Sequence, residues 1–511
     1  MAKKSTKKRP SHMPPEEMSG ALFFSLLSVA ILTAVVLHLC LYFDGFYSIS
    51  ADESGHTLEA HDWSLKKGLA PTFWLPFYRV IVGLALQLRP DLFTTPRIVI
   101  FLFGLSTLIG TTWLSFELFK SKKVTAIAAF LCALFPARVV LSLVPMAEMM
   151  YCSFIVAGMI FFARWSASLQ LRDLLLASGS FILGSTVRYE GWIFAGCFAV
   201  TALIFVISRD SERSFPRSAS AAAILLAASF PMFWIVFFAV KTGNPLGFVG
   251  EIAGRWELVR GTSKAQLLNN IVVSQFAQQS LITFNAAGLI SLAYFIREHR
   301  WIRWWVSVPA ASLLVMSAIG YFTKGVANHN PWRVVVVWSL LLIPFTASWI
   351  LQQGKIRFSS DSEQKLSKYT VICTLFFFLS LFGLYIYWMT RQSAFTTEDR
   401  LAGEYLNETL AVTPGQGKAR VLIETSDWSF LNIVVASQHP EAFVYNSGPD
   451  PFMPGEYIID LKNAIDTSKL AENGIGLLVF RGPSYKARLQ YSAKIAKLKD
   501  IGYWSVYELR R

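Results

Sequence analysis

Long apolar runs recur along this chain and constrain its fold more than any other feature. Runs of eighteen or more apolar residues are each long enough to cross a bilayer as a helix. Hydrophobic residues make up 54% of the 511 residues and charged residues only 16%, which is too apolar for a soluble chain. The sequence therefore predicts a polytopic α-helical membrane protein.

The basic residues of the chain follow membrane topology. The formal net charge is +14, but the basic residues lie mostly in short loops between apolar runs. That distribution is typical of the positive-inside rule, so we expect membrane lipids and no nucleic acid as partners. The five cysteines all lie inside apolar runs without paired spacing, so they indicate neither a disulfide framework nor a metal site.

Twelve apolar runs are present, but twelve crossings would put most of the basic loops on the side opposite the N-terminal tail, against the positive-inside rule. The runs begin near residues 20, 71, 98, 124, 146, 174, 191, 218, 281, 304, 334 and 369. The second run, residues 71–88, carries two prolines, aromatic residues and a mid-run Arg79, which favour a helix lying at the membrane interface. We therefore expect about eleven transmembrane helices plus one interfacial helix in the first outer loop.

The positive-inside rule orients these eleven crossings. With the basic tail 1–19 in the cytoplasm, the cytoplasmic segments hold about twenty Lys and Arg in roughly sixty residues. The outer loops hold about twelve in more than about a hundred residues, which is the sense that the rule requires. This orientation puts the transmembrane domain, residues 20–389, in the cytoplasmic (inner) membrane, with the acidic loop 44–97 outside.

Residues 390–511 differ in composition from the rest of the chain. Short runs of strand character, 419–425, 442–448, 474–482 and 503–510, alternate with stretches of helical period at 427–437 and 486–498. We expect a small exterior soluble α/β domain here. A cap or docking module is the interpretation that its sequence favours over a second catalytic domain, because it has no phosphate-binding or nucleophile motif.

An acidic pair, Asp52-Glu53, follows the first apolar run in the stretch "YSISADESGHTLEAHDW". His56, Glu59 and His61 come after it at helical spacing, which predicts a short helix with a polar face. Adjacent carboxylates repel unless one is protonated or both meet cations. That arrangement favours a functional site, although a solvated loop pair is the alternative.

Three further charged residues lie at the edges of apolar runs. Glu148 in "PMAEMM" begins a run, where it is either a functional carboxylate or a helix N-terminal cap. Arg188 and Glu190 in "TVRYEGW" lie between two runs with almost no loop. They are either a buried pair that packs helices or a site in which Arg188 binds a phosphate and Glu190 orients a sugar hydroxyl.

The stretch "KGVANHNPWR" supplies cations at the rim of another run. Lys324, His329 and Arg333 are donors of the kind that a lipid phosphate requires. Snorkelling to lipid headgroups explains Lys324 equally well. It explains Arg333 less well, because a long apolar run follows directly.

The order of these pieces resembles the C-type membrane glycosyltransferases, which take a sugar from a polyprenyl-phosphate carrier. The chain is most similar to the protein-mannosyltransferase and aminoarabinose-transferase-like branch over about residues 20–390. The matching pieces, in order, are "ADESGH", "FWLPFY", "PDLFTTPRIVIFLFGLSTLIG", "PMAEMM", "TGNPLGF" and "NHNPWRVVVVW". The chain departs from the aminoarabinose branch in its first loop, where "GLAPTFW" carries neither Glu nor Lys.

The resemblance implies an inverting transfer from a polyprenyl-phosphate sugar to a hydroxyl of a glycan, lipid or protein acceptor. It implies that Asp52 is the base and Glu53 its catalytic neighbour, and it leaves open a divalent metal ion with Glu53 and Glu148 as candidate ligands. The residues implied for binding the donor and substrate are His56, Glu148, Arg188, Glu190, His329 and Arg333.

Two other classes of protein share some of these features. A transporter or flippase of lipid-linked glycans is also polytopic, but such proteins usually show internal repeats, and none was found in this sequence. A non-catalytic subunit of a cell-envelope complex would account for the C-terminal domain. It would not account for the carboxylates of the first loop.

Overall fold

The computed structural model describes most of the chain, and every structural statement below concerns the described residues. It leaves out residues 1–17, 51, 67, 69–70, 73, 209–216, 250–281, 300, 323–331, 354–360, 392, 413–419, 426–427, 446–466, 482–492 and 511. Nearly all of the expected cytoplasmic tail and His329 therefore lie outside the described residues.

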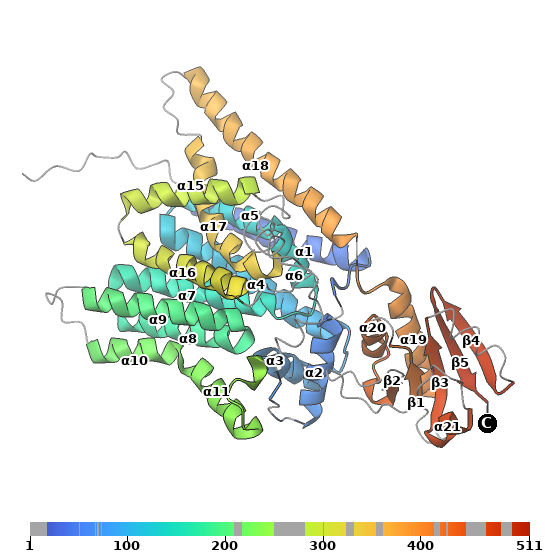
Figure 1. Cartoon of the computed structure of the whole chain (residues 1–511). Helices are drawn as coiled ribbons and strands as arrows, with labels where there is room; N and C mark the ends of the chain where they lie inside the picture. The colour runs from blue at the N-terminus through green and yellow to red at the C-terminus, as the bar shows by residue number, and fades with distance from the viewer. Residues whose placement is uncertain are drawn as a thin grey trace, which may run out of the picture.

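A bundle of apolar helices forms the larger part of the molecule (Figure 1). Seven described helices are long and apolar enough to cross a membrane. They are α1 (Gly20–Phe43), α4 (Thr94–Phe119), α7 (Glu148–Ser168), α9 (Tyr189–Ser208), α16 (Ile302–Phe322), α17 (Trp332–Gln353) and α18 (Asp361–Thr390).

Two bent pairs raise the number of membrane-capable elements in the described chain to nine. They are α5 (Lys122–Leu134) with α6 (Pro136–Leu143), and α10 (Arg217–Ala227) with α11 (Ser229–Thr242). Helices α8 (Leu171–Val187) and α15 (Ile282–Glu298), each of 17 residues, pack in the same bundle. Each of the eleven runs expected to cross thus coincides with a helix or a bent pair, and the fold is that of a polytopic helical membrane protein.

The break between α5 and α6 has a visible cause. Pro136 has no N–H for the helical ladder, and Phe135 before it is extended, so the axis bends by 52°. The break frees carbonyls at the end of α5. The buried Arg138 guanidinium donates to two of them, the carbonyls of Cys132 (2.7 Å) and Ala133 (2.6 Å). Arg138 therefore satisfies the polar groups that the proline exposes inside the bundle.

Helices α2 (Asp52–Lys66) and α3 (Pro76–Leu88) form a hairpin at one end of the bundle. The 13 residues of α3 rise about 20 Å, which is too short for a hydrocarbon core of about 30 Å. A Cβ at Gly83 of α3 would overlap the ring of Trp63 in α2, so the glycine permits this close packing. The short length of α3 agrees with an interfacial helix rather than a crossing.

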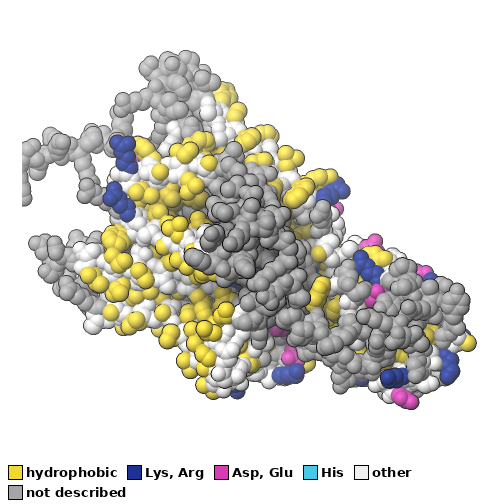
Figure 2. All heavy atoms as spheres, in the orientation of Figure 1, with side chains coloured by type: hydrophobic (Ala, Val, Ile, Leu, Met, Phe, Trp, Pro, Cys, Tyr) yellow, Lys and Arg dark blue, Asp and Glu magenta, His cyan; other side chains and the backbone are white. Residues whose placement is uncertain are grey.

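The two ends of the bundle differ in charge. The end that carries α2, called the α2 end below, also receives the start of α7, the turn between α8 and α9, the start of α17 and the end of α18. The basic connection Lys120–Lys123 joins α4 to α5 at the opposite end. Hydrophobic side chains cover much of the visible bundle, and charged side chains are visible mainly at its edges and on the C-terminal unit (Figure 2).

The chain after α18 folds into a five-stranded sheet with helices on both faces. The strand order is β2-β1-β3-β5-β4, with β1 parallel to β2 and β3, and β5 antiparallel to β3 and β4. Helices α19 and α20 cover one face and α21 covers the other. The bounds are α19 (Thr397–Val412), β1 (Arg420–Ile423), α20 (Phe430–Ala436), β2 (Phe443–Tyr445), α21 (Thr467–Glu472), β3 (Ile475–Phe480), β4 (Ile495–Ile501) and β5 (Trp504–Leu509).

The four runs of predicted strand character coincide with β1, β2, β3 and β5, and the helical stretch 427–437 contains α20. The prediction of helical period over 486–498 was wrong at its C-terminal end, where residues from Ile495 onward form β4. A tight turn through Gly502, at φ +58°, pairs this segment with β5. The pairing decided against the helix. Residues 486–492 lie outside the described chain.

Candidate functional site

The predicted acidic helix exists, and its two carboxylates point to different surroundings. Asp52 opens α2 and its side chain is 56% exposed. Glu53 is 1% exposed, and its carboxylate accepts from the backbone N–H groups of Ile49 (2.8 Å) and Ser50 (3.1 Å) and from the Ser50 hydroxyl (2.9 Å). Asp52 is therefore the open member of the pair, and Glu53 binds the loop that precedes it.

Burial also changes the acidity of the two neighbouring titratable groups on α2. Burial raises the pKa of Glu53 to about 6, against the opposing effects of the Ile49 N–H and the charge of Arg333. Burial lowers the pKa of His56 to about 4, so this imidazole is neutral at pH 7. The ring of His56 stacks on Trp74 with centroids 4.1 Å apart and also lies beside Tyr78. His56 therefore contributes a neutral, aromatic surface one turn along α2 from Asp52.

Arg333, at the start of α17, reaches the acidic helix across the bundle. Its Nη1 donates to Asp52 Oδ2 at 3.3 Å, while Nε and Nη2 lie 2.8 and 2.7 Å from Glu148 Oε1. The Arg333 side chain is 8% exposed and Glu148 is fully buried. Residues separated by 281 positions in the chain therefore meet in one ion pair, and Arg333 connects the exposed carboxylate to a buried one.

Arg188 extends the cluster in the other direction. Its guanidinium donates to Glu148 Oε1 at 2.8 Å and to both oxygens of Glu190, at 2.7 and 3.1 Å. Burial acts to lower the pKa of Arg188, but the charges of Glu190 and Glu148 outweigh it and raise the pKa above its ordinary value. The result is one chain of alternating charge, Asp52–Arg333–Glu148–Arg188–Glu190, at the α2 end. This set is called the charged cluster below.

Two polar atoms beside this cluster have no hydrogen-bond partner among the described residues. They are Glu148 Oε2 and the hydroxyl of Tyr151, one turn further along α7. Both residues are buried. Buried polar atoms without a partner are costly, so these two are places where a ligand hydroxyl or water would be bound favourably.

Gly191 shapes the turn that holds Arg188 and Glu190. A Cβ at this position would overlap the carbonyl of Gly184 on the preceding helix, so only glycine allows α8 and α9 to approach this closely. We expect Gly191→Ala to push the two helices apart and to destabilise the protein by about 1–3 kcal/mol, the usual cost of overpacking. Thermal unfolding of the detergent-solubilised protein measures this. Gly196→Ala on the same helix, where a Cβ meets nothing within 4 Å, is the control. Equal melting temperatures for the two variants would contradict the assignment.

The candidate metal ligands do not fit a divalent cation. Both oxygens of Glu53 accept from loop donors, and Glu148 Oε1 already accepts from two guanidinium groups. A divalent ion on Glu148 would lie beside the charges of Arg188 and Arg333. Within the described ranges, no group of three or more His, Cys, Asp or Glu residues is arranged to hold a metal.

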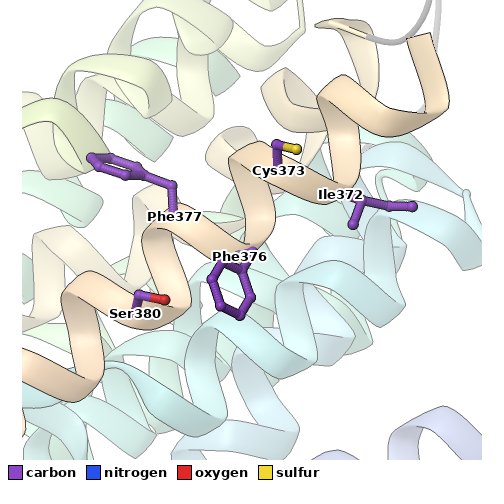
Figure 3. Close-up of a pocket in the computed structure, with 5 residues that line it drawn as sticks. All are labelled: Ile372, Cys373, Phe376, Phe377 and Ser380. Atoms are coloured by element: carbon purple, nitrogen blue, oxygen red, sulfur yellow. The ribbon is translucent and has the colours of Figure 1, made fainter. Parts of the chain in front are cut away.

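An apolar hollow on α18 lies away from the charged cluster. It encloses about 380 Å³ and is lined by Ile372, Cys373, Phe376, Phe377 and Ser380, all from one helix (Figure 3). Ser380 is ten residues, or about 15 Å of helix, before Thr390, where α18 reaches the α2 end. The hollow is apolar and faces outward along a membrane-capable helix, as expected for a surface in contact with acyl chains.

Comparison with solved structures decides the fold. The crystal structure of ArnT from Cupriavidus metallidurans in the apo state matches with a TM-score of 0.63 over 95% of this chain and 97% of that chain, at 10% identity. The same protein bound to undecaprenyl phosphate matches with a TM-score of 0.60 at 11% identity, over the same shares of both chains. This chain has the GT-C fold of the membrane glycosyltransferases.

A second protein of known structure matches this chain with a lower TM-score. The Archaeoglobus fulgidus oligosaccharyltransferase in its apo form has a TM-score of 0.55 at 14% identity, over 93% of this chain and 72% of that one. A complex of that enzyme contains zinc and sulfate. No protein-family model and no curated protein matches the sequence. The identity is low throughout, so the comparisons establish the fold and the residues must support the chemistry.

The sequence selected every member of the charged cluster and offered a buried Arg188–Glu190 pair as one alternative, which the structure contains. It gave no indication that Arg333 pairs with Asp52 and Glu148, or that Arg188 also reaches Glu148. His329 lies outside the described residues. Asn432 in α20 accepts from Ser54 of α2, and Asp399 in α19 accepts from Asn432. Neither carried a sequence signal, because neither belongs to a recognisable motif.

Proposed function

We propose that this protein is an inverting glycosyltransferase that moves a sugar from a polyprenyl-phosphate carrier to a hydroxyl of a glycan, lipid or protein. The GT-C fold and the membrane-capable bundle support the class. One observation carries the chemistry: an exposed carboxylate, Asp52, lies at the α2 end of the bundle in contact with a buried arginine, Arg333.

Asp52 is suited to act as the base. The acceptor hydroxyl must lose a proton as its oxygen attacks the anomeric carbon, and an exposed carboxylate at the mouth of the site can receive that proton. The bond from the anomeric carbon to the phosphate oxygen breaks as the bond to the acceptor oxygen forms. The polyprenyl phosphate leaves with the bonding electron pair. Attack from the side opposite the phosphate inverts the anomeric configuration.

Arg333 is suited to bind the leaving phosphate. Its Nη1 makes the longest contact of the guanidinium, 3.3 Å to Asp52, whereas Nε and Nη2 hold Glu148 at 2.8 and 2.7 Å. A phosphate oxygen can replace Asp52 at Nη1 while the contacts to Glu148 stay in place. Donor binding would then free the Asp52 carboxylate for the acceptor, so the donor would bind before the acceptor.

The remaining members of the site would bind the sugar. Glu148 Oε2 and the Tyr151 hydroxyl are buried and without partners in the described structure, and sugar hydroxyls match both. The stacked rings of His56 and Trp74 offer a face on which a sugar ring can pack. Glu53 serves as the residue that shapes the loop before Asp52, and we propose no metal ligand role for it.

A transporter or flippase of lipid-linked glycans, and a non-catalytic subunit, are the other functions considered. The assay that separates them uses purified protein in liposomes with a radiolabelled polyprenyl-phosphate sugar and a panel of hydroxyl acceptors. Transfer of label from the lipid to an acceptor, with release of polyprenyl phosphate, supports the proposal. Movement of intact labelled lipid between leaflets without transfer would contradict it.

We propose that the α2 end and residues 390–511 face the exterior of the cytoplasmic membrane and that the tail 1–19 is cytoplasmic. The basic connections at the opposite end support this orientation. Reporter fusions at Lys122 and after Arg511 are expected to report opposite sides, with Lys122 inside. Both fusions reporting one side would contradict an odd number of crossings and the shared face of the site.

A further inference from the structure

We propose that the C-terminal α/β unit fixes the position of the Asp52 helix, with Ser54 and Asn432 as positioning residues for the reaction. The proposal rests on the proposed function in that Asp52 is taken as the base. It goes beyond the expectation of a cap or docking module.

The contact between the two parts is a buried hydrogen bond. The hydroxyl of Ser54, two residues after Asp52, donates to Asn432 Oδ1 at 2.8 Å. Ser54 is 3% exposed and Asn432 is fully buried in α20. A hydrogen bond shielded from water is directional and costly to break, so it fixes the orientation of α2 rather than merely covering it.

The amide of Asn432 is itself held by the C-terminal unit. Its Nδ2 donates to the carbonyl of Ala394 (3.1 Å) and to Asp399 Oδ2 (3.2 Å). Asp399 is fully buried, and its Oδ1 accepts from the Tyr503 hydroxyl and Trp504 Nε1, both at 2.8 Å. The hydrogen bonds therefore run without interruption from the helix of the proposed base to the last strand of the sheet. This set, Ser54–Asn432–Asp399–Trp504, is called the brace below.

The backbone on the other side of Asp52 is tied to the same unit. The N–H of Ala394 donates to the carbonyl of Ser48 at 3.0 Å, and Arg400 Nη1 donates to the Tyr47 hydroxyl at 2.9 Å. Asp52 thus lies between two attachment points, at residues 47–48 and at Ser54. Both attachments come from residues that follow the last membrane-capable helix.

Packing reinforces the hydrogen bonds. Leu58, one turn after Ser54, packs against both the bundle core and the core beneath the sheet. Figure 1 shows α2 and α3 between the bundle and the C-terminal sheet. Helix α2 is therefore held on two sides. Without its contacts to the C-terminal unit, α2 would be held mainly by its packing against α3.

A base must approach the acceptor proton closely, and a displacement of about 1 Å can lower the rate about a hundredfold. Loss of one hydrogen bond moves α2 by less, so we expect Ser54→Ala and Asn432→Ala each to lower kcat about tenfold. The donor KM should stay within about twofold, because Arg333 and Glu148 belong to the bundle and not to the brace. The double variant should be no slower than the slower single variant, because both changes remove the same hydrogen bond between Ser54 and Asn432.

Asn473→Ala is the matched control. Asn473 has the same side chain in the same unit, but among the described residues its amide donates only to the carbonyl of Lys469, one turn earlier. Its kcat should equal that of the wild type. Melting curves of all variants identify any loss of folding, and Ser54→Ala tests the brace without disturbing Asp399.

Hydrogen–deuterium exchange tests the position of α2 independently of catalysis. Hydrogen–deuterium exchange of the α2 amides should rise in Ser54→Ala and in Asn432→Ala and stay unchanged in Asn473→Ala. Unchanged exchange in the first two variants, additive losses of kcat, or a loss confined to the donor KM would overturn the brace. A wild-type protein without transfer activity but with increased α2 exchange in the variants would overturn the proposed function alone.

Discussion

Asp52→Asn is expected to lower kcat about a hundredfold or more while leaving the donor KM nearly unchanged, because an amide accepts a hydrogen bond but cannot take a proton. Folding should be nearly unaffected. The Asp52 side chain is 56% exposed, and ion pairs of exposed carboxylates contribute about 0–1 kcal/mol to stability. The amide oxygen can still accept from Arg333. Initial rates at saturating acceptor over a range of donor concentrations measure both constants.

Glu53→Gln is the control for this prediction, because the residue is adjacent and differs in burial. Its carboxylate oxygens accept from the loop at Ile49 and Ser50, and the amide NH₂ of glutamine cannot accept in their place. We expect a lower melting temperature, from a loss of about 1–3 kcal/mol, with a smaller decrease of kcat than for Asp52→Asn. A larger decrease for Glu53→Gln would reverse the assignment within the pair. Full activity of both amides would mean that the acidic pair takes no part in transfer.

Arg333→Lys is expected to weaken donor binding about ten- to a hundredfold, equivalent to about 1.5–3 kcal/mol for a charge-assisted contact. Lysine keeps the positive charge, but its single ammonium cannot hold Glu148 through two nitrogens and leave a third for the phosphate. Lysine is used instead of alanine because alanine would remove one of the two cations that pair with the buried Glu148. The donor KM, or the Kd of labelled polyprenyl phosphate, measures the effect.

Arg164→Ala is the matched control for Arg333→Lys. Arg164 pairs with Asp173 at the opposite end of the bundle and is 39% exposed, so its loss should leave the donor KM unchanged. An Arg333→Lys protein with a wild-type donor KM would retire the phosphate role. The two effects are separable, since Asp52→Asn is expected to change kcat and Arg333→Lys to change binding of the donor.

The sequence by itself determined the class and much of the fold. Apolar runs longer than a bilayer core leave the chain no soluble alternative, because a helix satisfies its own backbone hydrogen bonds in lipid. The exclusion of residues 71–88 from the crossings followed from the positive-inside rule together with the prolines and mid-run arginine of that run, and the structure gives there a helix of 13 residues. Four of the five strands followed from short runs rich in β-forming residues. The fifth, β4, was missed because 486–498 also matches a helical period and only pairing with β5 decides between them.

The sequence also selected the charged residues of the site, since each is an expensive polar group at the end of an apolar run. The Arg188–Glu190 pair was one of the alternatives that the sequence offered, whereas the ion pairs across the bundle were decided by tertiary structure alone. Nothing local in the sequence indicates that Arg333 lies between Asp52 and Glu148. Nor does it indicate that Glu53 accepts hydrogen bonds from the preceding loop and does not pair with Arg333.

The contribution of the C-terminal unit depends on tertiary structure even more strongly. Asn432 lies in the apolar run of a short helix, and Ser54 is an ordinary serine, so neither has a pattern that marks it. Their hydrogen bond joins positions 378 residues apart. Periodicity records which face of a segment is buried, whereas the partner of a buried polar atom is set by how distant segments pack against each other.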